Sequence, residues 1–226
     1  MKISIAIDGP AGAGKSTIAK IIGDKYNLMY INTGAMYRAV TLCAMNEGIE
    51  PHRVEELCRL VDSLEMHFDK ENLIVNGVDV TSEITMPLIS NNVSNYAAIA
   101  EIRAKLVELQ RNISKKYSVI MDGRDIGTVV LVNADLKFFL TASAEERARR
   151  RYEELKGRDL EVEYNTILQD IIKRDYMDTH REVDPLTKAE DAVEINSSEL
   201  DINGVVNVIS DYIDKYLNKK TKNNLS

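Results

Sequence analysis

The stretch Gly9-Pro-Ala-Gly-Ala-Gly-Lys-Ser16 follows a short isoleucine-rich run at positions 3–7. Residues 15–25, which come next, carry isoleucine and alanine at helical spacing. A strand, a glycine-rich loop and a helix in this order begin a βαβ unit. The pattern G-x-x-x-x-G-K-[ST] within such a unit binds nucleotide phosphates. The stretch therefore predicts an α/β fold that binds a nucleoside triphosphate.

Each part of this phosphate loop has a chemical role. Glycines let the backbone curl so that successive N–H groups point at phosphate oxygens, and the following helix adds its positive end. Lys15 is expected to reach the β- and γ-phosphates, and Ser16 to offer its hydroxyl to Mg²⁺. The alternative, a glycine-rich turn with a chance lysine, fits poorly between a strand and a helix. The predicted donor contacts are Gly9, Pro10, Ala11, Gly12, Ala13, Gly14, Lys15, Ser16 and Thr17.

Further short apolar runs at 28–31, 118–121, 136–140 and 192–195 are predicted strands. Helical patterns separate them, which predicts a mostly parallel five-stranded sheet between two helical layers, a three-layer α/β/α fold. In such sheets ligands bind beyond the carboxyl ends of the strands. The predicted helices span 34–46, 54–64, 84–96, 99–117, 145–155, 163–178 and 202–217.

One segment interrupts this alternation. Met66-His-Phe68 and Leu73-Ile-Val75 are short apolar runs, and Asn76-Gly77 separates the second from Val78-Asp-Val80. Asn-Gly between apolar residues is a strong hairpin signal. We therefore expect a small antiparallel sheet inserted into the parallel fold.

Composition limits the classes of protein that fit. The chain has 226 residues, 44% hydrophobic and 29% charged, which suits one domain with an insert. Its net charge of −7 argues against a nucleic-acid partner. Cys43 and Cys58 are too few for a disulfide framework, so we expect a cytoplasmic location. No apolar run is long enough to span a bilayer, so no membrane partner is expected. The sequence shows no obvious association motif, so we expect a monomer.

Phosphate loops also occur in GTPase switches and in mechanical or DNA-handling ATPases. A GTPase needs an Asn-Lys-x-Asp guanine reader, and here Asn218-Lys219 is followed by Thr221 where Asp should stand. Such ATPases are usually longer, with a strand that ends in an acidic pair. A small-molecule kinase is therefore the favoured class.

Arginines occur where a phosphate-bearing acceptor would need them, because the guanidinium group binds phosphate in a bidentate manner. Arg38 and Arg124 each follow a predicted strand end. For Arg149 and Arg151, pairing with glutamates on the same helix is an equal alternative. Arg147 and Arg150 lie on the predicted helix over 145–155, and Arg174 and Arg181 flank Asp178 near the end of the next helix.

These motifs together resemble bacterial cytidylate kinases. The resemblance rests on Asp8-Gly-Pro-Ala-Gly-Ala-Gly-Lys-Ser-Thr17, Asn32-Thr-Gly-Ala-Met-Tyr-Arg38, Asp122-Gly-Arg-Asp-Ile-Gly-Thr-Val-Val130, Glu145-Glu-Arg-Ala-Arg-Arg150 and Arg174-Asp-x-x-Asp178. The motifs occur in the family's order and cover nearly the whole chain. Thr33 departs from the family, which has serine there; the hydroxyl is kept, and the added methyl group alters the fit of an acceptor.

The resemblance implies Mg²⁺-dependent phosphoryl transfer from ATP to CMP and dCMP, giving CDP and dCDP. It also implies a core at about 1–62, 118–144 and 186–217, with a nucleoside-monophosphate-binding insert at about 63–117. A short helical lid would occupy about 145–185. The sequence over 218–226 is mainly polar, so we expect a flexible tail there. A kinase for UMP or shikimate on the same scaffold, or a nucleic-acid module using the arginine-rich helix, are the alternatives.

The resemblance also assigns roles to individual residues. Asp125 would accept a hydrogen bond from the cytosine amino group and would lose that partner with uracil, which favours CMP. Without the family, Ser94 could be an ordinary helix serine and Arg103 an exposed helix arginine. The implied catalytic residues are Lys15, Arg124, Arg174 and Arg181. The implied acceptor-binding residues are Thr33, Tyr37, Arg38, Ser94, Arg103, Arg124, Asp125, Arg174, Asp178 and Arg181. Arg147, Arg150 and Arg151 would belong to the lid over the donor phosphates.

Overall fold

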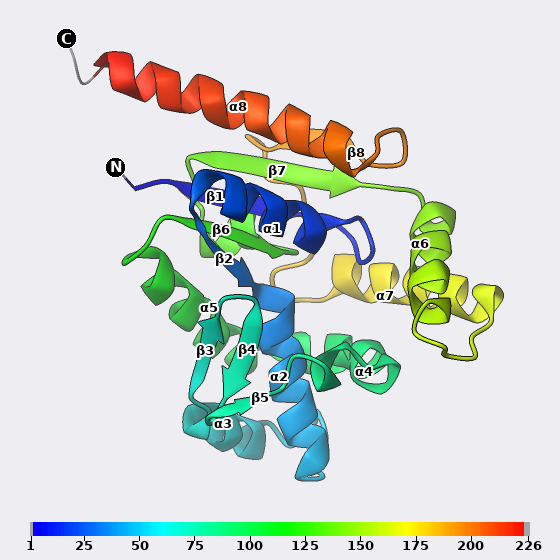
Figure 1. The fold of residues 1–226 in the computed structure, drawn as a ribbon. Coiled ribbons are helices and arrows are strands. Elements are labelled where there is room, and N and C mark those ends of the chain that lie inside the picture. Colours follow the sequence, from blue (N-terminus) through cyan, green and yellow to red (C-terminus); the bar gives the residue numbers. More distant parts are fainter. Residues whose placement is uncertain (1, 224–226) are drawn as a thin grey trace.

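The central sheet has five parallel strands in the order β2-β6-β1-β7-β8 and lies in the upper half of Figure 1. A computed structural model describes residues 2–223. All five strands predicted from the sequence are present, so the mostly parallel α/β fold is confirmed. The strands are β1 (Ser4–Asp8), β2 (Met29–Asn32), β6 (Val119–Gly123), β7 (Leu136–Thr141) and β8 (Val193–Asn196).

Alternation along β1 divides the core between the two faces of the sheet. Ile5 and Ile7 pack against α1 (Lys15–Tyr26) and α8 (Ile202–Asn223), which lie side by side on one face. Ala6, between them, belongs to a separate cluster on the other face. A strand buried on both sides reads as a continuous apolar run, which is why the middle of β1, Ile5-Ala-Ile7, is apolar.

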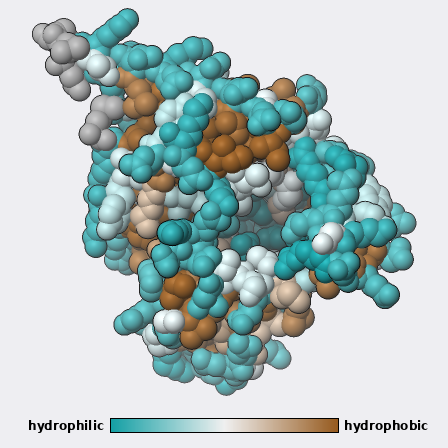
Figure 2. Space-filling model, in the orientation of Figure 1, coloured by the Kyte–Doolittle hydropathy of each residue, from teal (hydrophilic) through white to brown (hydrophobic). Residues whose placement is uncertain are grey.

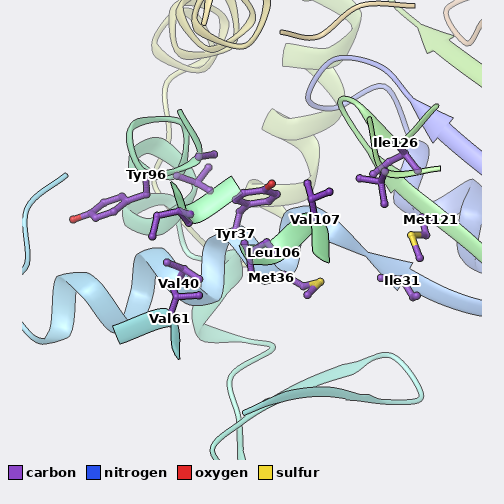
Figure 3. Packing of buried hydrophobic residues seen from close by; sticks show 14 of the residues in the cluster. Ile31, Met36, Tyr37, Val40, Val61, Tyr96, Leu106, Val107, Met121 and Ile126 are labelled. Carbon is purple, nitrogen blue, oxygen red and sulfur yellow. The ribbon is translucent and has the colours of Figure 1, made fainter. Parts of the chain in front are cut away.

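The second cluster joins the sheet to the lower half of the molecule. It extends from Ile31 and Met121 on the strands, through Met36 and Leu106, to Val61 (Figure 3). These last three residues lie on α2 (Thr33–Asn46), α5 (Ala100–Ser114) and α3 (Val54–Ser63), respectively. The apolar core is therefore continuous between the parallel sheet and the helices that carry the inserted segment.

The inserted antiparallel sheet consists of β3 (Met66–Asp69), β4 (Asn72–Val75) and β5 (Val78–Asp79). The predicted hairpin at Asn76-Gly77 is confirmed, because both residues have positive φ (49° and 80°), as a tight hairpin turn requires.

The helix predicted over 84–96 is wrong in one respect. The chain forms a short 3₁₀ turn, η1 (Glu83–Thr85), and then α4 (Pro87–Ala97). Met86 between them has an extended backbone (ψ 146°), because proline disfavours a helical conformation in the residue before it.

Two further helices, α6 (Ala144–Lys156) and α7 (Tyr164–His180), project beside the carboxyl ends of the strands (Figure 1). They share a small apolar cluster of their own, built on Ala148, Leu155, Ile167 and Ile171. This cluster is separate from the clusters on the sheet, so the pair packs together as a unit.

The sequence predicted a flexible tail over 218–226, whereas α8 continues through Asn223. Tyr216 and Lys220 both donate to Asp135, the residue before β7, which holds this end of the helix on the sheet. The rest of the predicted tail lies outside the described residues. None of the helices within 2–223 combines the length and apolar character needed to cross a bilayer.

Candidate active site

A cleft opens at the carboxyl ends of β1, β2 and β6. In Figure 2 it is the hollow between the core above, α6 and α7 to the right, and the inserted segment below. From the phosphate loop and the start of α1, the residues Ala11, Gly12, Lys15 and Ser16 line it. All of the acceptor residues implied by the family line it as well: Thr33, Tyr37, Arg38, Ser94, Arg103, Arg124, Asp125, Arg174, Asp178 and Arg181.

The phosphate loop has the backbone that its glycines allow. Gly9, Gly12 and Gly14 have φ values of 146°, 77° and 89°. A Cβ atom on Gly9 would lie 2.1 Å from the carbonyl oxygen of Leu140 on β7, so the loop leaves the sheet where no side chain fits. Because α1 begins immediately after Gly14, its positive end points at the same place.

Lys15 is buried, and its Nζ donates to the carbonyl oxygen of Pro10 at 2.7 Å. Burial, followed by the positive charge of Arg124, lowers the pKa of Lys15 well below its usual range. Asp122 and Asp8 oppose this shift. The lysine is thus held across the loop in a strongly cationic site, where a negative ligand would stabilise its charged form.

Ser16 belongs to a short chain of hydrogen bonds. Its hydroxyl donates to Asp122 Oδ2 at 2.9 Å, and the hydroxyl of Tyr30 donates to Asp122 Oδ1 at 2.8 Å. Asp122 lies near the end of β6, next to β1 in the sheet. Each carboxylate oxygen therefore accepts one hydrogen bond, and the two bonds orient Asp122 toward the phosphate loop.

Two arginines in the cleft keep a buried nitrogen without a hydrogen-bond acceptor among the described residues. These are the Nε atoms of Arg38 and Arg174. Burial, reinforced by Arg124, lowers the pKa of Arg174 to about 10, and burial also lowers that of Arg38. Arg174 Nε still forms a long ion pair with Asp178 Oδ2, at 4.0 Å. The cleft is lined by Lys15 and five arginines but by only three aspartates, so it carries an excess of positive charge suited to anionic ligands.

Arg124 shares the cleft with a carboxylate. Its Nε donates to Asp178 Oδ2 at 2.8 Å, and Ser94 donates to Asp178 Oδ1 at 3.3 Å. Burial opposes the ionised form of Asp178, yet Arg124 and Arg174 lower its pKa overall. Asp178 on α7 therefore connects Ser94 on α4 to Arg124, the residue that follows β6.

A second group of charges surrounds Asp125. The Arg103 guanidinium donates to Asp125, to the carbonyl oxygen of Ala97 and, at 2.9 Å, to Asp184. Arg103 is only 1% exposed, so it is not the exposed helix arginine considered as an alternative. Burial raises the pKa of Asp125, while Arg103 and Arg181 oppose that shift.

Tyr37 and Thr33 complete this part of the cleft. The Tyr37 hydroxyl is buried and has no hydrogen-bond partner within 2–223, and Arg103 lies over its ring at 5.5 Å from the centroid. Thr33 donates to the carbonyl oxygen of Asp122 at 2.7 Å. The Thr33 hydroxyl is thus bound to the backbone, whereas the Tyr37 hydroxyl is free to bind a ligand.

The arginines of α6 lie outside this cleft. Arg147 is buried and donates to Asp175 and to the carbonyl oxygen of Ala11 in the phosphate loop. Arg150 donates to the carbonyl oxygen of Ser197. Arg149 pairs with two glutamates of its own helix, the pattern of a solvated helix face. Arg151 pairs with one glutamate and also donates to the carbonyl oxygen of Thr85, at 3.5 Å. An adjoining hollow is lined in part by Ala13, Gly14, Thr17 and Arg150.

Sequence reasoning missed several residues of this region. Asp122 and Asp8 were visible at strand ends beside the phosphate loop, a position that could have singled them out. Tyr30 and Asp184 gave no such signal, because their partners lie 92 and 81 residues away in the chain.

Comparison with known proteins agrees with this geometry. A family model described as "Cytidylate kinase" matches residues 5–215. The chain is 63% identical to a cytidylate kinase of Clostridium perfringens over 94% of this chain and 98% of that protein. It is 60% identical to a cytidylate kinase of Clostridium acetobutylicum over 97% of this chain and 100% of that protein.

A solved structure of an uncharacterized protein from Eubacterium ventriosum has a TM-score of 0.52 to this chain at 16% identity. The matched region covers 95% of this chain and 99% of the chain from Eubacterium ventriosum. At this sequence identity the match shows a shared fold alone. The two cytidylate kinases are far more similar in sequence, at 63% and 60% identity, over nearly the full length of this chain and of those proteins. The chain belongs to the cytidylate kinase family.

Proposed function

We propose that the protein transfers the γ-phosphoryl group of ATP to CMP and dCMP, giving CDP and dCDP. The observation that carries this proposal is the pair of buried arginine nitrogens, on Arg38 and Arg174, without acceptors in the cleft of the phosphate loop. Two phosphate-bearing substrates would supply the missing acceptors. Membership of the cytidylate kinase family supports the same pair of substrates.

The acceptor would lie between the two groups of charges. Its phosphate would contact Arg38, Arg124 and Arg181, and its sugar Arg174 and Asp178. Its cytosine would lie against Ser94, Arg103 and Asp125, with Asp125 as acceptor for the amino group. The Tyr37 hydroxyl, which lacks a partner, is a further donor in the same wall.

The proposed reaction is an in-line attack by an acceptor phosphate oxygen on the γ-phosphorus. That oxygen is already anionic near neutral pH, so the site needs no strong general base. Lys15, Arg124, Arg174 and Arg181 would neutralise charge that develops in the transition state. In the proposed division of the chain, 145–185 acts as the lid that excludes water, and 63–117 as the acceptor-binding insert.

Mg²⁺ is the proposed cofactor, arriving with ATP. Ser16 and Asp122 offer a hydroxyl and carboxylate oxygens at the phosphate loop, and such hard donors suit this ion. When bound, the ion would neutralise charge on the triphosphate. The Ser16 hydroxyl donates a hydrogen bond to Asp122, which leaves the lone pairs of its oxygen free for a cation. The proposed place of action is the cytoplasm, and the proposed oligomeric state is a monomer.

A coupled assay of ATP consumption with CMP, dCMP, UMP, AMP and shikimate as acceptors tests this function. We expect fast turnover with CMP and dCMP, weak turnover with UMP, and none with AMP or shikimate. A Lys15→Met variant should lose the activity, which shows that turnover arises at this site. Absence of CMP-dependent turnover by the wild-type protein would refute the proposal.

A further inference from the structure

Asp8 is a buried carboxylate that lies between the phosphate loop and the turn that follows Asp125. It is the last residue of β1, directly before Gly9 of the phosphate loop, and it is 3% exposed. Its Oδ1 accepts from the backbone N–H of Ile126 at 2.8 Å, and its Oδ2 accepts from that of Gly127 at 2.7 Å. Asp8 itself does not line the cleft. Its contacts therefore join two backbone segments that are 118 residues apart.

Ile126 and Gly127 begin the single π-helical turn η2 (Ile126–Val130), and Asp125 is the residue that precedes it. The carbonyl oxygen of Asp125 accepts from Val129 N at 2.8 Å within the same turn. The backbone N–H groups held by Asp8 thus follow Asp125 directly in the chain. The turn that Asp8 holds is therefore next in the chain to Asp125, whose carboxylate lines the cleft.

The turn lies close against the Asp8 carboxylate. A Cβ atom on Gly127 would lie 3.3 Å from Asp8 Oδ2 and 3.1 Å from Lys137 Cδ. The Lys137 ammonium group pairs with Asp191 instead, so the hydrogen bonds to Asp8 come from backbone N–H groups. A buried carboxylate is costly to desolvate, and two N–H donors compensate for that cost only in part. Stability alone therefore does not explain an ionisable residue here.

We propose that Asp8 is a positioning residue for acceptor specificity. It connects the end of the phosphate-loop strand to the turn that follows Asp125, and so sets the position of the base-reading carboxylate relative to the phosphate loop. Asp8 acts through Asp125 and does not touch the acceptor. This inference rests on the proposed phosphorylation of CMP and extends it to a residue outside the cleft.

An Asp8→Asn variant tests the inference, because asparagine keeps the volume and one acceptor oxygen but turns an N–H donor toward one of the two backbone N–H groups. We expect the KM for CMP to rise about tenfold, the loss that one hydrogen bond to a charged group implies. The ratio of kcat/KM for CMP to that for UMP should fall by a similar factor. The KM for ATP should stay within about twofold, since the phosphate loop keeps its own contacts.

A Gly127→Ala variant perturbs the same contact from the opposite side and should give the same pattern. It also decides the question if Asp8→Asn does not fold. Asp135→Asn is the matched control, because Asp135 also accepts from a backbone N–H of the β1 strand, that of Ser4 at 2.9 Å, but before β7 at the far end of the sheet. It should lower stability and leave both KM values and the CMP-to-UMP ratio unchanged.

The inference is overturned if Asp8→Asn or Gly127→Ala folds with lower stability while the KM for CMP and the CMP-to-UMP ratio equal those of the wild type. That outcome would assign Asp8 a structural role only. The proposed function fails by a different result, the absence of CMP turnover in the wild-type protein in the same assay. The two failures are therefore distinguishable.

Discussion

Arg103 on α5 and Asp125 after β6 form an ion pair with side chains only 2% and 6% exposed. Asp184 binds the Nε of the same guanidinium, so Arg103 is held by two carboxylates. Because its partner Arg103 is held in place, the Asp125 carboxylate needs little reorganisation when a base binds, which favours selective recognition.

Replacing Asp125 by asparagine should remove selectivity for cytosine. The variant loses a charged acceptor for the cytosine amino group, and Arg103 keeps only Asp184 as a carboxylate partner. We expect kcat/KM for CMP to fall on the order of 100-fold and the preference over UMP to shrink, as measured by steady-state kinetics with both acceptors. Asp62→Asn, which breaks the exposed pair between Asp62 on α3 and Lys105 on α5, is the control. Unchanged kcat/KM for CMP in the Asp125 variant would contradict cytosine reading.

Replacing Arg38 by methionine should stabilise the ligand-free protein and weaken acceptor binding. Methionine fills similar space and removes the charge of a half-buried side chain whose buried Nε has no acceptor among the described residues. We expect the free energy of unfolding in urea to rise by about 1–2 kcal/mol and the KM for CMP to rise on the order of 100-fold. Arg53→Met, at an exposed arginine paired with Glu56, should change neither quantity much. Lower stability together with unchanged affinity would show that Arg38 is structural.

The stability difference between the wild type and Asp8→Asn should depend on pH. Burial raises the pKa of Asp8 from 3.8 to about 6, although the hydrogen bonds from the backbone N–H groups of Gly127 and Ile126 oppose this shift. Between these two values the folded protein binds a proton that the unfolded chain has released. The contribution of Asp8 to stability is therefore greatest in acid and is lost as the pH rises toward 6.

Relative to the variant, the wild type should lose about 2 kcal/mol of unfolding free energy between about pH 4.5 and pH 7. Urea denaturation of both proteins across this range measures the difference, and other titrating groups cancel because both proteins contain them. A difference that stays constant over this range would show that the pKa of Asp8 is not raised.

Replacing Asp175 by asparagine should loosen α6 and α7 from the phosphate loop. Arg147 donates to both oxygens of Asp175 at 3.0 and 2.6 Å and also to the carbonyl oxygen of Ala11 at 3.0 Å. We expect a loss of about 3 kcal/mol in urea and a severalfold higher KM for ATP, because a buried arginine loses its charged partner. Glu153→Gln, which removes an exposed partner of Arg149 on α6, should cost under about 0.5 kcal/mol. Equal losses in both variants would contradict this role for Arg147.

Features determined by neighbouring residues were predictable from the sequence. The phosphate loop needs only a strand, its glycines and the next helix, and the hairpin needs only Asn76-Gly77 between apolar runs. Arg38 and Arg124 each follow a strand end, and the carboxyl ends of parallel strands meet at one edge of the sheet, so their proximity was predictable as well. Patterns among neighbouring residues were thus enough to predict the fold, the phosphate loop and the two arginines at strand ends.

Long-range pairing was beyond the same reasoning. Arg103 meets Asp184 across 81 residues, and Arg147 meets Asp175 through the packing of two helices. Ser94 and Arg103 came from the family resemblance, since periodicity alone cannot distinguish a buried helix arginine from an exposed one. The contact of Arg147 with donor phosphates stays a prediction. In this structure Arg147 donates to Asp175 and to the carbonyl oxygen of Ala11.

The end of α8 near Lys220 lies against the amino end of β7, and Lys2 lies beside the end of α5, where it donates to the carbonyl oxygen of Lys115. Both lysines are therefore on the opposite edge of the sheet from the cleft. A solid support coupled through either one would leave the mouth of the cleft open to the surrounding buffer. The fold thus offers attachment points for an immobilised enzyme or a surface-bound sensor whose substrates arrive from the free side.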